Sequence, residues 1–438
     1  MNGNDRAVSY RVLQAWARLA VAVFYRRTDV TGRHHLDPRR PAVLAANHAS
    51  ALGDVAVIVA TMPRFPHFLA SASWWKSPPA RLLFRLGGVL PIHRRRDSDT
   101  GNNVSTFEAC DDALAHGAHL CIFPEGEMHD EPALLPLKTG AARIALGAGC
   151  DAGVPGVVVV PVGLVYEDRG RFRSDTEVHF GEPIAVEDWA GAYRADPAKA
   201  VRDLTDVLAD RLADVTVNHG SPAEASTLAN AAATALADTP DASLPRRNAM
   251  RRALARGVAL TGGEDGEQFR ALESAVGEHR ADLDAIGLGH RGCTVPIVGE
   301  DARLVAQRRV ELFVLAVPAA LGALVNAPIA AGAGLAATRV RDDGWRATVK
   351  GVTGTFLAPL VWGGEYALLA RRVPRRWAFA FTAAGALSGR AALAWHDRWR
   401  EHRVSASVRR AIATRPGDVL RARESRARVR ALVDQTAS

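Results

Sequence analysis

A chain of 438 residues is too long for one ordinary domain and predicts two or three folded units. Its four cysteines are scattered without a Cys-x-x-Cys pair, which argues against a disulfide framework and a cysteine-based zinc site. The formal net charge of +8 comes almost entirely from arginine, since only four lysines occur. It indicates an anionic partner, which is a nucleic acid, a phosphorylated substrate or a membrane surface. The polar start, "MNGNDRAVSY", predicts no signal peptide.

The first segment, residues 1–30, contains a run that is apolar on one broad face. Residues 10–27 include Trp16, Phe24 and Tyr25, but Arg18 interrupts the run, which leaves it too short to span a bilayer. Two readings stay open, an N-terminal amphipathic helix at a membrane interface and a first core helix.

Residues 31–190 alternate apolar, strand-like runs with helical patterns. This alternation predicts one α/β domain with a mixed, largely parallel sheet and flanking helices. The expected strands are residues 42–47, 67–71, 88–94, 118–123, 156–166 and 177–180, and the expected helices are residues 52–62, 78–87, 101–116 and 138–149.

The composition of the second half of the chain changes twice. Residues 191–305 are polar, rich in Ala, Arg and Asp, and helical in pattern. Residues 306–400 carry hydrophobic segments that we expect to associate with a membrane, and residues 401–438 form an Arg-rich basic tail.

The longest charge-free segment, residues 312–338, is long enough to span a bilayer as one helix. Asn326 and Pro328 lie near its middle, where proline breaks or kinks a helix. Because both flanks are basic, the positive-inside rule places both ends on the cytoplasmic side. We therefore expect a re-entrant hairpin in the cytoplasmic leaflet, with residues 351–370 behaving alike. A kinked transmembrane helix is the alternative.

The stretch "NHASALGD" places a histidine and an aspartate on one short turn after an apolar strand. Ser50 is expected to cap the following helix, Asp54 falls in its first turn, and Gly53 is expected to give backbone freedom. If His48 folds back over the helix start, the Asp54 carboxylate can orient its imidazole as a general base. No Gly-x-Ser-x-Gly motif supplies a protein nucleophile, which leaves a substrate hydroxyl as a candidate for that role. The alternative is a structural loop histidine beside an acid favoured by the helix dipole.

Three further motifs follow apolar strands. "GVLPIHRRRD" ends in arginines that begin with Arg94, "FPEGE" carries Glu125 and Gly126, and "VVVPVG" carries Pro161. Lys138 precedes a helix start at Gly140. Because ligands of open α/β sheets bind at the carboxyl ends of strands, the four motifs predict one shared site.

These four ordered motifs resemble those of the glycerolipid acyltransferases, and "VHFGEPI" (178–184) is similar to the family's closing strand. The resemblance covers residues 40–190 and implies an α/β domain at a membrane surface. It implies that His48 is the general base and that Asp54 orients it. The substrate-binding residues that it implies are Asn47, Arg94, Glu125, Gly126, Lys138 and Pro161, with Arg94 on the acceptor's phosphate.

The activity that the resemblance implies is acyl transfer in phospholipid biosynthesis. An acyl thioester, acyl-CoA or acyl-carrier protein, would donate to a hydroxyl of glycerol-3-phosphate or 1-acylglycerol-3-phosphate. A backbone N–H near His48 or Gly126 is expected to stabilise the oxyanion. We expect no metal, no organic cofactor and no nucleic-acid partner, and a location on the cytoplasmic face of the cell membrane through the hydrophobic C-terminal segments. The alternatives are transfer to another lysolipid or polyol, or a non-catalytic membrane protein with this fold.

Two departures from the commoner family pattern concern the acceptor. Five residues separate His48 from Asp54 instead of four, and "FPEGE" continues as "MHDEPALLPLKTG". Both features resemble a longer-spaced subgroup that reads "NHPNALLDP" and includes fungal-type glycerol-3-phosphate and dihydroxyacetone-phosphate acyltransferases.

Overall fold

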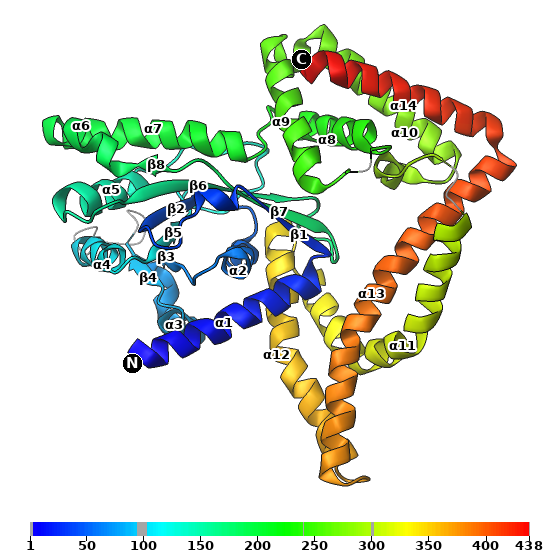
Figure 1. Ribbon diagram of the computed structural model, residues 1–438, viewed down its shortest axis with the longest axis horizontal. Helices are drawn as coiled ribbons and strands as arrows, with labels where there is room; N and C mark the ends of the chain where they lie inside the picture. The colour runs from blue at the N-terminus through cyan, green and yellow to red at the C-terminus, as the bar shows by residue number, and fades with distance from the viewer. Residues whose placement is uncertain (1–2, 94–102, 240, 299–301, 438) are drawn as a thin grey trace. The chain divides into compact units, whose positions relative to one another are not determined.

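A computed structural model describes residues 3–93, 103–239, 241–298 and 302–437 (Figure 1). The chain divides into two compact units. Unit 1 comprises residues 1–169 and 174–217, and unit 2 comprises residues 170–173 and 218–438. Apart from residues 170–173, the expected segments 1–30 and 31–190 fall within unit 1, which continues to Val217.

Unit 1 is built on an eight-stranded sheet in the order β1-β7-β6-β2-β5-β3-β4, with β8 also paired to β6. All neighbouring strands run parallel except β7 and β8, which are antiparallel to β6. The expected mixed, mostly parallel sheet is therefore confirmed. The strands are β1 (Arg27–Thr31), β2 (Ala42–Ala46), β3 (His67–Ser71), β4 (Leu90–Ile92), β5 (His119–Ile122), β6 (Val158–Tyr166), β7 (Asp175–Phe180) and β8 (Ile184–Ala185).

Helices cover both faces of this sheet (Figure 1). In β2, Val43 and Ala45 point to the face where α4, α5 and α7 pack, because side chains alternate along a strand. Helix α1 packs on α2, and Val21 and Phe24 of α1 are buried. The helices of unit 1 are α1 (Gly3–Phe24), α2 (Ala51–Thr61), α3 (Pro78–Leu86), α4 (Asn103–Ala115), α5 (Gly140–Leu146), α6 (Ala190–Ala195) and α7 (Pro197–Val215), with shorter helical turns at η1 (Arg33–His35), η2 (Ala72–Lys76), η4 (Gly147–Asp151) and η5 (Val186–Trp189).

The strands that were expected agree with the observed ones to within about two residues at their ends, and β2 and β6 are uninterrupted apolar runs. The sequence prediction missed β1 and β8. Strand β1 reads "RTDVT", which lacks an apolar run because it lies at the sheet edge and pairs with β7 alone. Strand β8 has only two residues.

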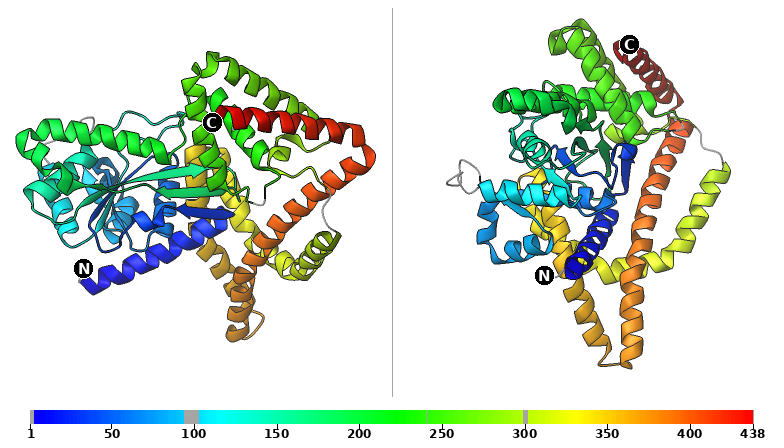
Figure 2. Two further views of the ribbon diagram at one scale, coloured as in Figure 1. Left: turned by 45° about the horizontal axis from the view of Figure 1, so that its top comes forward. Right: turned by 60° about the vertical axis from the view of Figure 1, so that its left-hand side comes forward.

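Unit 2 is helical in its described residues. Helices α8, α9, α10 and α14 enclose a core that contains Leu228, Leu254, Leu272 and Val429. The Arg-rich tail is thus an integral helix of this core, and Figure 2 shows α14 in red beside α10. The helices are α8 (Pro222–Leu236), α9 (Leu244–Leu260), α10 (Glu267–Ala285), α11 (Ala302–Thr338), α12 (Asp343–Leu369), α13 (Arg375–Thr414) and α14 (Pro416–Ala437), with shorter turns at η6 (Gly263–Asp265) and η7 (Gly289–Thr294).

Helices α11, α12 and α13 contain the hydrophobic segments. Within the described residues, α11 is the one helix that is long and apolar enough to cross a membrane, judged by length and composition. A hairpin inside residues 312–338 is not confirmed, because α11 is continuous through Pro318 and Pro328. It bends along its length instead (Figure 2), as prolines inside a helix cause it to do. Residues 351–369 likewise lie in one helix, α12, which forms an antiparallel hairpin with α13 (Figure 1).

Candidate active site

His48 and Asp54 meet at the carboxyl end of β2. The imidazole Nδ1 lies 2.9 Å from Asp54 Oδ2. Because a carboxylate only accepts hydrogen bonds, Nδ1 must carry the proton, which leaves Nε2 as the unprotonated nitrogen. The described residues give Nε2 no hydrogen bond, and the His48 side chain is 19% exposed. This nitrogen is therefore available to take a proton from a bound hydroxyl.

The turn between the two residues is built around the Asp54 carboxylate. Asp54 is fully buried, and its Oδ2 also accepts the backbone N–H groups of Ala49 and Ser50 at 2.8 and 2.7 Å. Ser50 directly precedes α2 as expected, but its hydroxyl makes no capping hydrogen bond. Asp54 reaches back to cap the helix instead, so one carboxylate both closes the turn and orients the imidazole.

The turn between His48 and Asp54 contains an unusual backbone conformation. Ala51 has a φ of +33°, a conformation that costs a residue with a Cβ atom free energy. Gly53, expected to supply flexibility, does not have a positive φ. Its lack of a side chain supplies space, because a Cβ there would lie 2.7 Å from Ser50 Oγ.

Glu125 holds the main chain of His48. This side chain is buried, and its Oε1 accepts the His48 backbone N–H at 2.9 Å. Its Oε2 accepts the Leu135 backbone N–H at 3.0 Å and contacts His129 Nε2. The "FPEGE" motif after β5 thereby holds the His48 turn after β2, its neighbour in the sheet.

The apolar face of the His48 imidazole rests on Phe123. The two rings are stacked with centroids 4.0 Å apart and planes 15° apart. Phe123 follows β5 directly. An aromatic platform restricts the imidazole to rotations that keep Nδ1 on Asp54.

Asn47 and Pro161 both belong to the join between β2 and β6. Asn47 Nδ2 donates to Leu164 O at 3.1 Å, and Asn47 Oδ1 accepts from Leu164 N at 2.7 Å. On one side of β6, Pro161 pairs with Ala45 of β2. On the opposite side, β6 pairs first with β8 and then with β7, and Pro161 lies in the gap between these two partners. Proline is tolerated within this strand because no ladder hydrogen bond is lost there.

Gly126 and Lys138 are brought together after β5. Gly126 has a φ of +83°, and a Cβ there would lie 3.4 Å from Lys138 Cγ. Lys138 is exposed, and the described residues give its ammonium no hydrogen bond or ion pair. Arg94 lies outside the described residues.

The backbone N–H groups expected to stabilise an oxyanion have partners within the protein. Those of His48, Ala49 and Ser50 donate to Glu125 and Asp54, and that of Gly126 donates to Phe123 O at 3.1 Å. None of these four groups is free in this conformation. The described residues also contain no cluster of three or more His, Cys, Asp or Glu side chains arranged to hold a metal ion.

Four residues at the site were not assigned roles from the sequence: Phe123, His129, Tyr166 and Arg169. Phe123 and His129 lie inside or just after "FPEGE", so their place in the motif was a usable signal. Arg169 donates to Ala49 O at 3.0 Å and pairs with Asp130 at 2.9 Å, which ties two site loops together. Tyr166 donates to Asp54 Oδ1 at 2.5 Å across 112 positions of sequence, and no local pattern signals that contact.

The described fold and the His48–Asp54 pair are those of an acyltransferase domain, and residues 27–165 match the family model described as Acyltransferase. This match covers about a third of the chain, all of it within unit 1, and these residues are similar to the glycerolipid acyltransferases.

Three similar proteins share parts of the chain. Glycerol-3-phosphate O-acyltransferase 2 of Saccharomyces cerevisiae is 41% identical over 118 residues, which cover 27% of this chain and 16% of the yeast protein. 1-acyl-sn-glycerol-3-phosphate acyltransferase alpha of Mus musculus is 30% identical over 159 residues, 36% of this chain and 51% of the mouse protein. The chain thus spans about half or less of these curated relatives. A crystal structure of the 1-acyl-sn-glycerophosphate acyltransferase of Thermotoga maritima aligns with 19% identity and a TM-score of 0.36, over 48% of this chain and 83% of that one.

Proposed function

We propose that the protein transfers an acyl group from acyl-CoA or acyl-carrier protein to a hydroxyl of glycerol-3-phosphate or 1-acylglycerol-3-phosphate. The observation that carries the proposal is the His48–Asp54 hydrogen bond of 2.9 Å, with Nε2 of the same ring unpartnered at the edge where β2, β5 and β6 end. The names of the yeast and mouse relatives supply the two acceptors.

The reaction uses a substrate hydroxyl as nucleophile. His48 Nε2 accepts the hydroxyl proton while the oxygen attacks the thioester carbonyl carbon, and Asp54 stabilises the resulting imidazolium. The tetrahedral intermediate then expels the thiolate, which takes the proton from Nε2, so the products are an ester and a free thiol. Burial raises the pKa of the nearby Cys121 thiol, with Asp54 adding to the effect, which disfavours a cysteine nucleophile.

The other site residues take supporting roles in this proposal. Arg94 and Lys138 hold the acceptor's phosphate, since cationic side chains bind phosphate oxygens strongly. Gly126 lines the acceptor site beside Lys138, and Pro161 shapes the acyl site. Asn47 and Glu125 keep the catalytic turn in place through their contacts with Leu164 and His48.

Purified full-length protein in mixed micelles, incubated with labelled palmitoyl-CoA, tests the activity. Glycerol-3-phosphate, 1-acylglycerol-3-phosphate, an unphosphorylated polyol and other lysolipids are supplied in separate reactions. We expect a labelled ester with one of the first two, and a loss of roughly 10²–10⁴-fold in kcat for His48→Ala and Asp54→Asn. If only the polyol or another lysolipid became labelled, the proposed acceptor would be wrong and that compound would take its place. No product with any acceptor, from either acyl donor, would favour the non-catalytic alternative.

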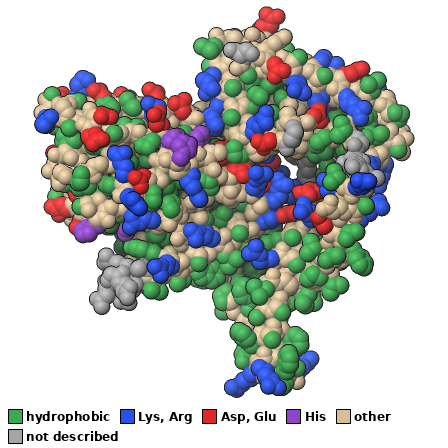
Figure 3. Space-filling view, viewed as in Figure 1, with side chains coloured by type: hydrophobic (Ala, Val, Ile, Leu, Met, Phe, Trp, Pro, Cys, Tyr) green, Lys and Arg blue, Asp and Glu red, His purple; other side chains and the backbone are tan. Residues whose placement is uncertain are grey.

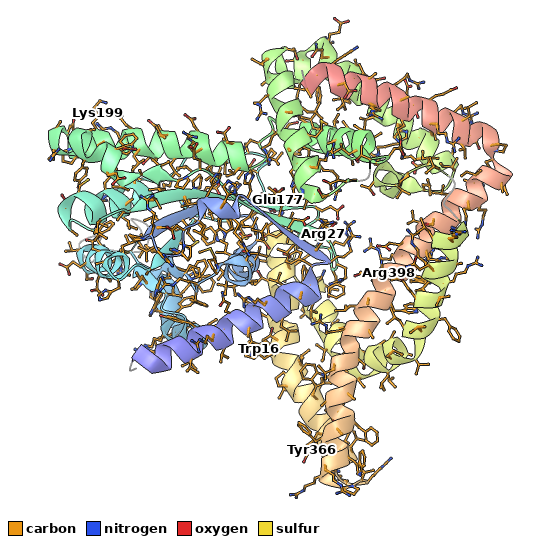
Figure 4. All side chains as sticks on the ribbon, in the orientation of Figure 1. Trp16, Arg27, Glu177, Lys199, Tyr366 and Arg398 are labelled. Carbon is orange, nitrogen blue, oxygen red and sulfur yellow. The ribbon has the colours of Figure 1, made fainter. Side chains whose placement is uncertain are left out.

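We also propose that the hydrophobic helices of unit 2 lie in the cytoplasmic side of a lipid bilayer. Large apolar side chains on α11, α12 and α13 are exposed, and the lower end of Figure 3 shows them in green over α12 and α13. The turn between these two helices carries exposed arginines at its tip, close to Tyr366 in Figure 4. The most exposed apolar residues are Phe313 (84%), Val317 (80%), Leu324 (75%), Leu387 (71%) and Leu360 (70%).

Polar and small residues lie between these helices, while large apolar side chains face outward. A water-soluble helical bundle has the opposite arrangement, with apolar side chains inside. Asn326 of α11 accepts from Trp362 Nε1 at 3.2 Å and donates to Gly385 O at 3.4 Å. A Cβ at Gly322 would lie 2.1 Å from Ser388 O, so the two backbones approach closely there. Helices associate in lipid through such small residues and interhelical hydrogen bonds.

Unit 1 also has a surface suited to a membrane, on helix α1. Helix α1 exposes Val8, Val12, Trp16, Leu19 and Val23, spaced three or four residues apart on one face (Figure 4). Its opposite face packs on α2, where Gln14 donates to Met62 O at 2.9 Å. We therefore propose that α1 lies at the interface plane with this apolar face in lipid.

Thiol labelling decides whether the hydrophobic helices cross. Single cysteines at Arg303, Arg341 and Arg372, in a background without the four native cysteines, are probed in intact cells with an impermeant reagent. Full protection, followed by labelling after lysis, is the expected result because all three positions are basic and cytoplasmic. Labelling of any one in intact cells would show a crossing helix. Flotation with liposomes, without DNA binding in a gel-shift assay, would separate the membrane partner from a nucleic acid.

A further inference from the structure

Tyr166 completes the hydrogen bonding of the Asp54 carboxylate. Its hydroxyl donates to Asp54 Oδ1 at 2.5 Å, while Oδ2 accepts from His48, Ala49 and Ser50. Asp54 has no exposed surface, so water cannot replace a missing donor. Among the described residues, Tyr166 is thus the one hydrogen-bond donor to Asp54 Oδ1, while His48 bonds to the other oxygen, Oδ2.

Tyr166 is protonated and rigidly placed. Burial, followed by the negative charge of Asp54, holds its pKa well above the ordinary value for tyrosine, so it donates rather than accepts. It ends β6 two residues after Leu164, whose backbone is clamped by Asn47. Its ring also packs on Tyr25, which is buried after α1, with centroids 5.7 Å apart.

We propose that Tyr166 is a positioning residue of the acyl-transfer site, which holds the Asp54 carboxylate so that Oδ2 stays on His48 Nδ1. The inference rests on the proposed function and extends it to a residue one position beyond the region that matches the family model. Without the phenol, Oδ1 is left buried without a donor, and the carboxylate turns to recover one. His48 then spends less time with Nε2 aimed at the acceptor hydroxyl.

Tyr166→Phe removes only the hydroxyl. We expect kcat to fall roughly 10- to 100-fold, the equivalent of one hydrogen bond to a charged group. KM for both substrates should change by less than about twofold, because in the proposed role Tyr166 acts through Asp54 and not on the substrates. Tyr193→Phe is the matched control, since Tyr193 also donates to a carboxylate of unit 1, Asp151, at 2.7 Å but on an exposed helix. It should keep wild-type kcat.

A double-mutant cycle separates positioning from a packing role. In the Asp54→Asn background, Tyr166→Phe should cost less than about threefold, because the group through which it acts is already disabled. Equal losses in both backgrounds would show that Tyr166 acts independently of Asp54, and would overturn the inference. So would wild-type kcat in Tyr166→Phe.

A spectroscopic measurement tests the same inference without turnover. The downfield proton resonance of His48 Nδ1, assigned by its loss in His48→Ala, should shift or broaden in Tyr166→Phe and stay unchanged in Tyr193→Phe. An unchanged resonance in Tyr166→Phe contradicts the inference even if the protein is inactive. A shifted resonance in a protein that transfers no acyl group supports the positioning role and rejects the proposed function alone.

Discussion

The backbone N–H of His48 and the Oε1 atom of Glu125 lie 2.9 Å apart, which links the turns after β2 and β5. Since β2 and β5 are parallel neighbours, their carboxyl ends meet at one sheet edge. His48, the proposed general base, is therefore held by two motifs 77 positions apart in sequence, the first through Asp54 and the second through Glu125.

Glu125→Gln tests this link. The amide keeps the shape but replaces one acceptor oxygen with a donor, which then faces the N–H of His48 or the donors on Oε2. We expect a loss of roughly 1–3 kcal/mol in the free energy of unfolding, together with reduced kcat. Chemical denaturation and steady-state kinetics measure the two effects. The control is Glu182→Gln, an exposed ion pair with Arg211, which should stay near wild type.

Gly53→Ala tests the space beneath the turn. A Cβ at Gly53 would lie 2.7 Å from Ser50 Oγ, so Ser50 must shift and carry its backbone N–H away from Asp54. We expect at least a tenfold loss of kcat. Gly191→Ala, at an exposed helical glycine with no atom within 4 Å of the added Cβ, should be neutral or slightly stabilising. Full activity of Gly53→Ala would mean that the turn does not need this gap.

Ala51→Gly tests the strain at the longer spacing. The φ of +33° disfavours alanine but not glycine, so the substitution should raise the free energy of unfolding by up to ~1 kcal/mol and preserve activity. Ala51→Val should lower the free energy of unfolding, since β-branched residues tolerate a positive φ least well. Thermal unfolding of the three proteins in parallel gives the order, and a valine variant as stable as the wild type would contradict it.

Arg94→Ala tests the assignment made from the resemblance. Removal of one charged partner of the phosphate should raise KM for the phosphorylated acceptor roughly tenfold or more, with KM for acyl-CoA unchanged. Lys199→Ala is the control, because Lys199 is an exposed cation of α7 paired with Asp203 (Figure 4). An equal rise for both substrates, or no rise, would remove Arg94 from the acceptor site.

His279 of α10 gives unit 2 a pH dependence. Burial, followed by the charge of Arg426, lowers its pKa to about 4, against an ordinary value near 6.5. Between pH 6.5 and 4, His279 is therefore protonated in the unfolded chain but neutral in the folded chain. Its contribution to the free energy of unfolding is fully present above pH 6.5 and is lost as the pH falls toward 4. We expect His279 to contribute a loss of roughly 2–3 kcal/mol over this window. His279→Asn should remove that contribution and leave the one from His219, whose pKa burial also lowers to about 4. Thermal unfolding at pH 7 and pH 5 measures it, with the exposed His116→Asn as control.

The sequence was informative where chemistry and hydrophobicity are local. His48, Asp54 and Glu125 lie in short motifs after buried strands, and both features are readable without a structure. Strand β1 was missed because its polar residues are compatible with an edge position, which depends on the distant strand β7. Tyr166 was missed because its partner lies 112 positions away, and only the pairing of β2 with β6 brings them together. Helix α11 continues through two prolines and packs against α12 and α13, and no local sequence pattern indicates that packing.

Pro161 has a consequence for the fidelity of folding. Strand β6 meets β8 at Val158 and Val159 and β7 from Val162 onward, and the proline between them has no N–H to offer. If β7 slid along β6 toward β8, it would face this missing donor and lose a rung of the ladder. The proline therefore disfavours a shifted register and helps to select the observed pairing of β6 with β7.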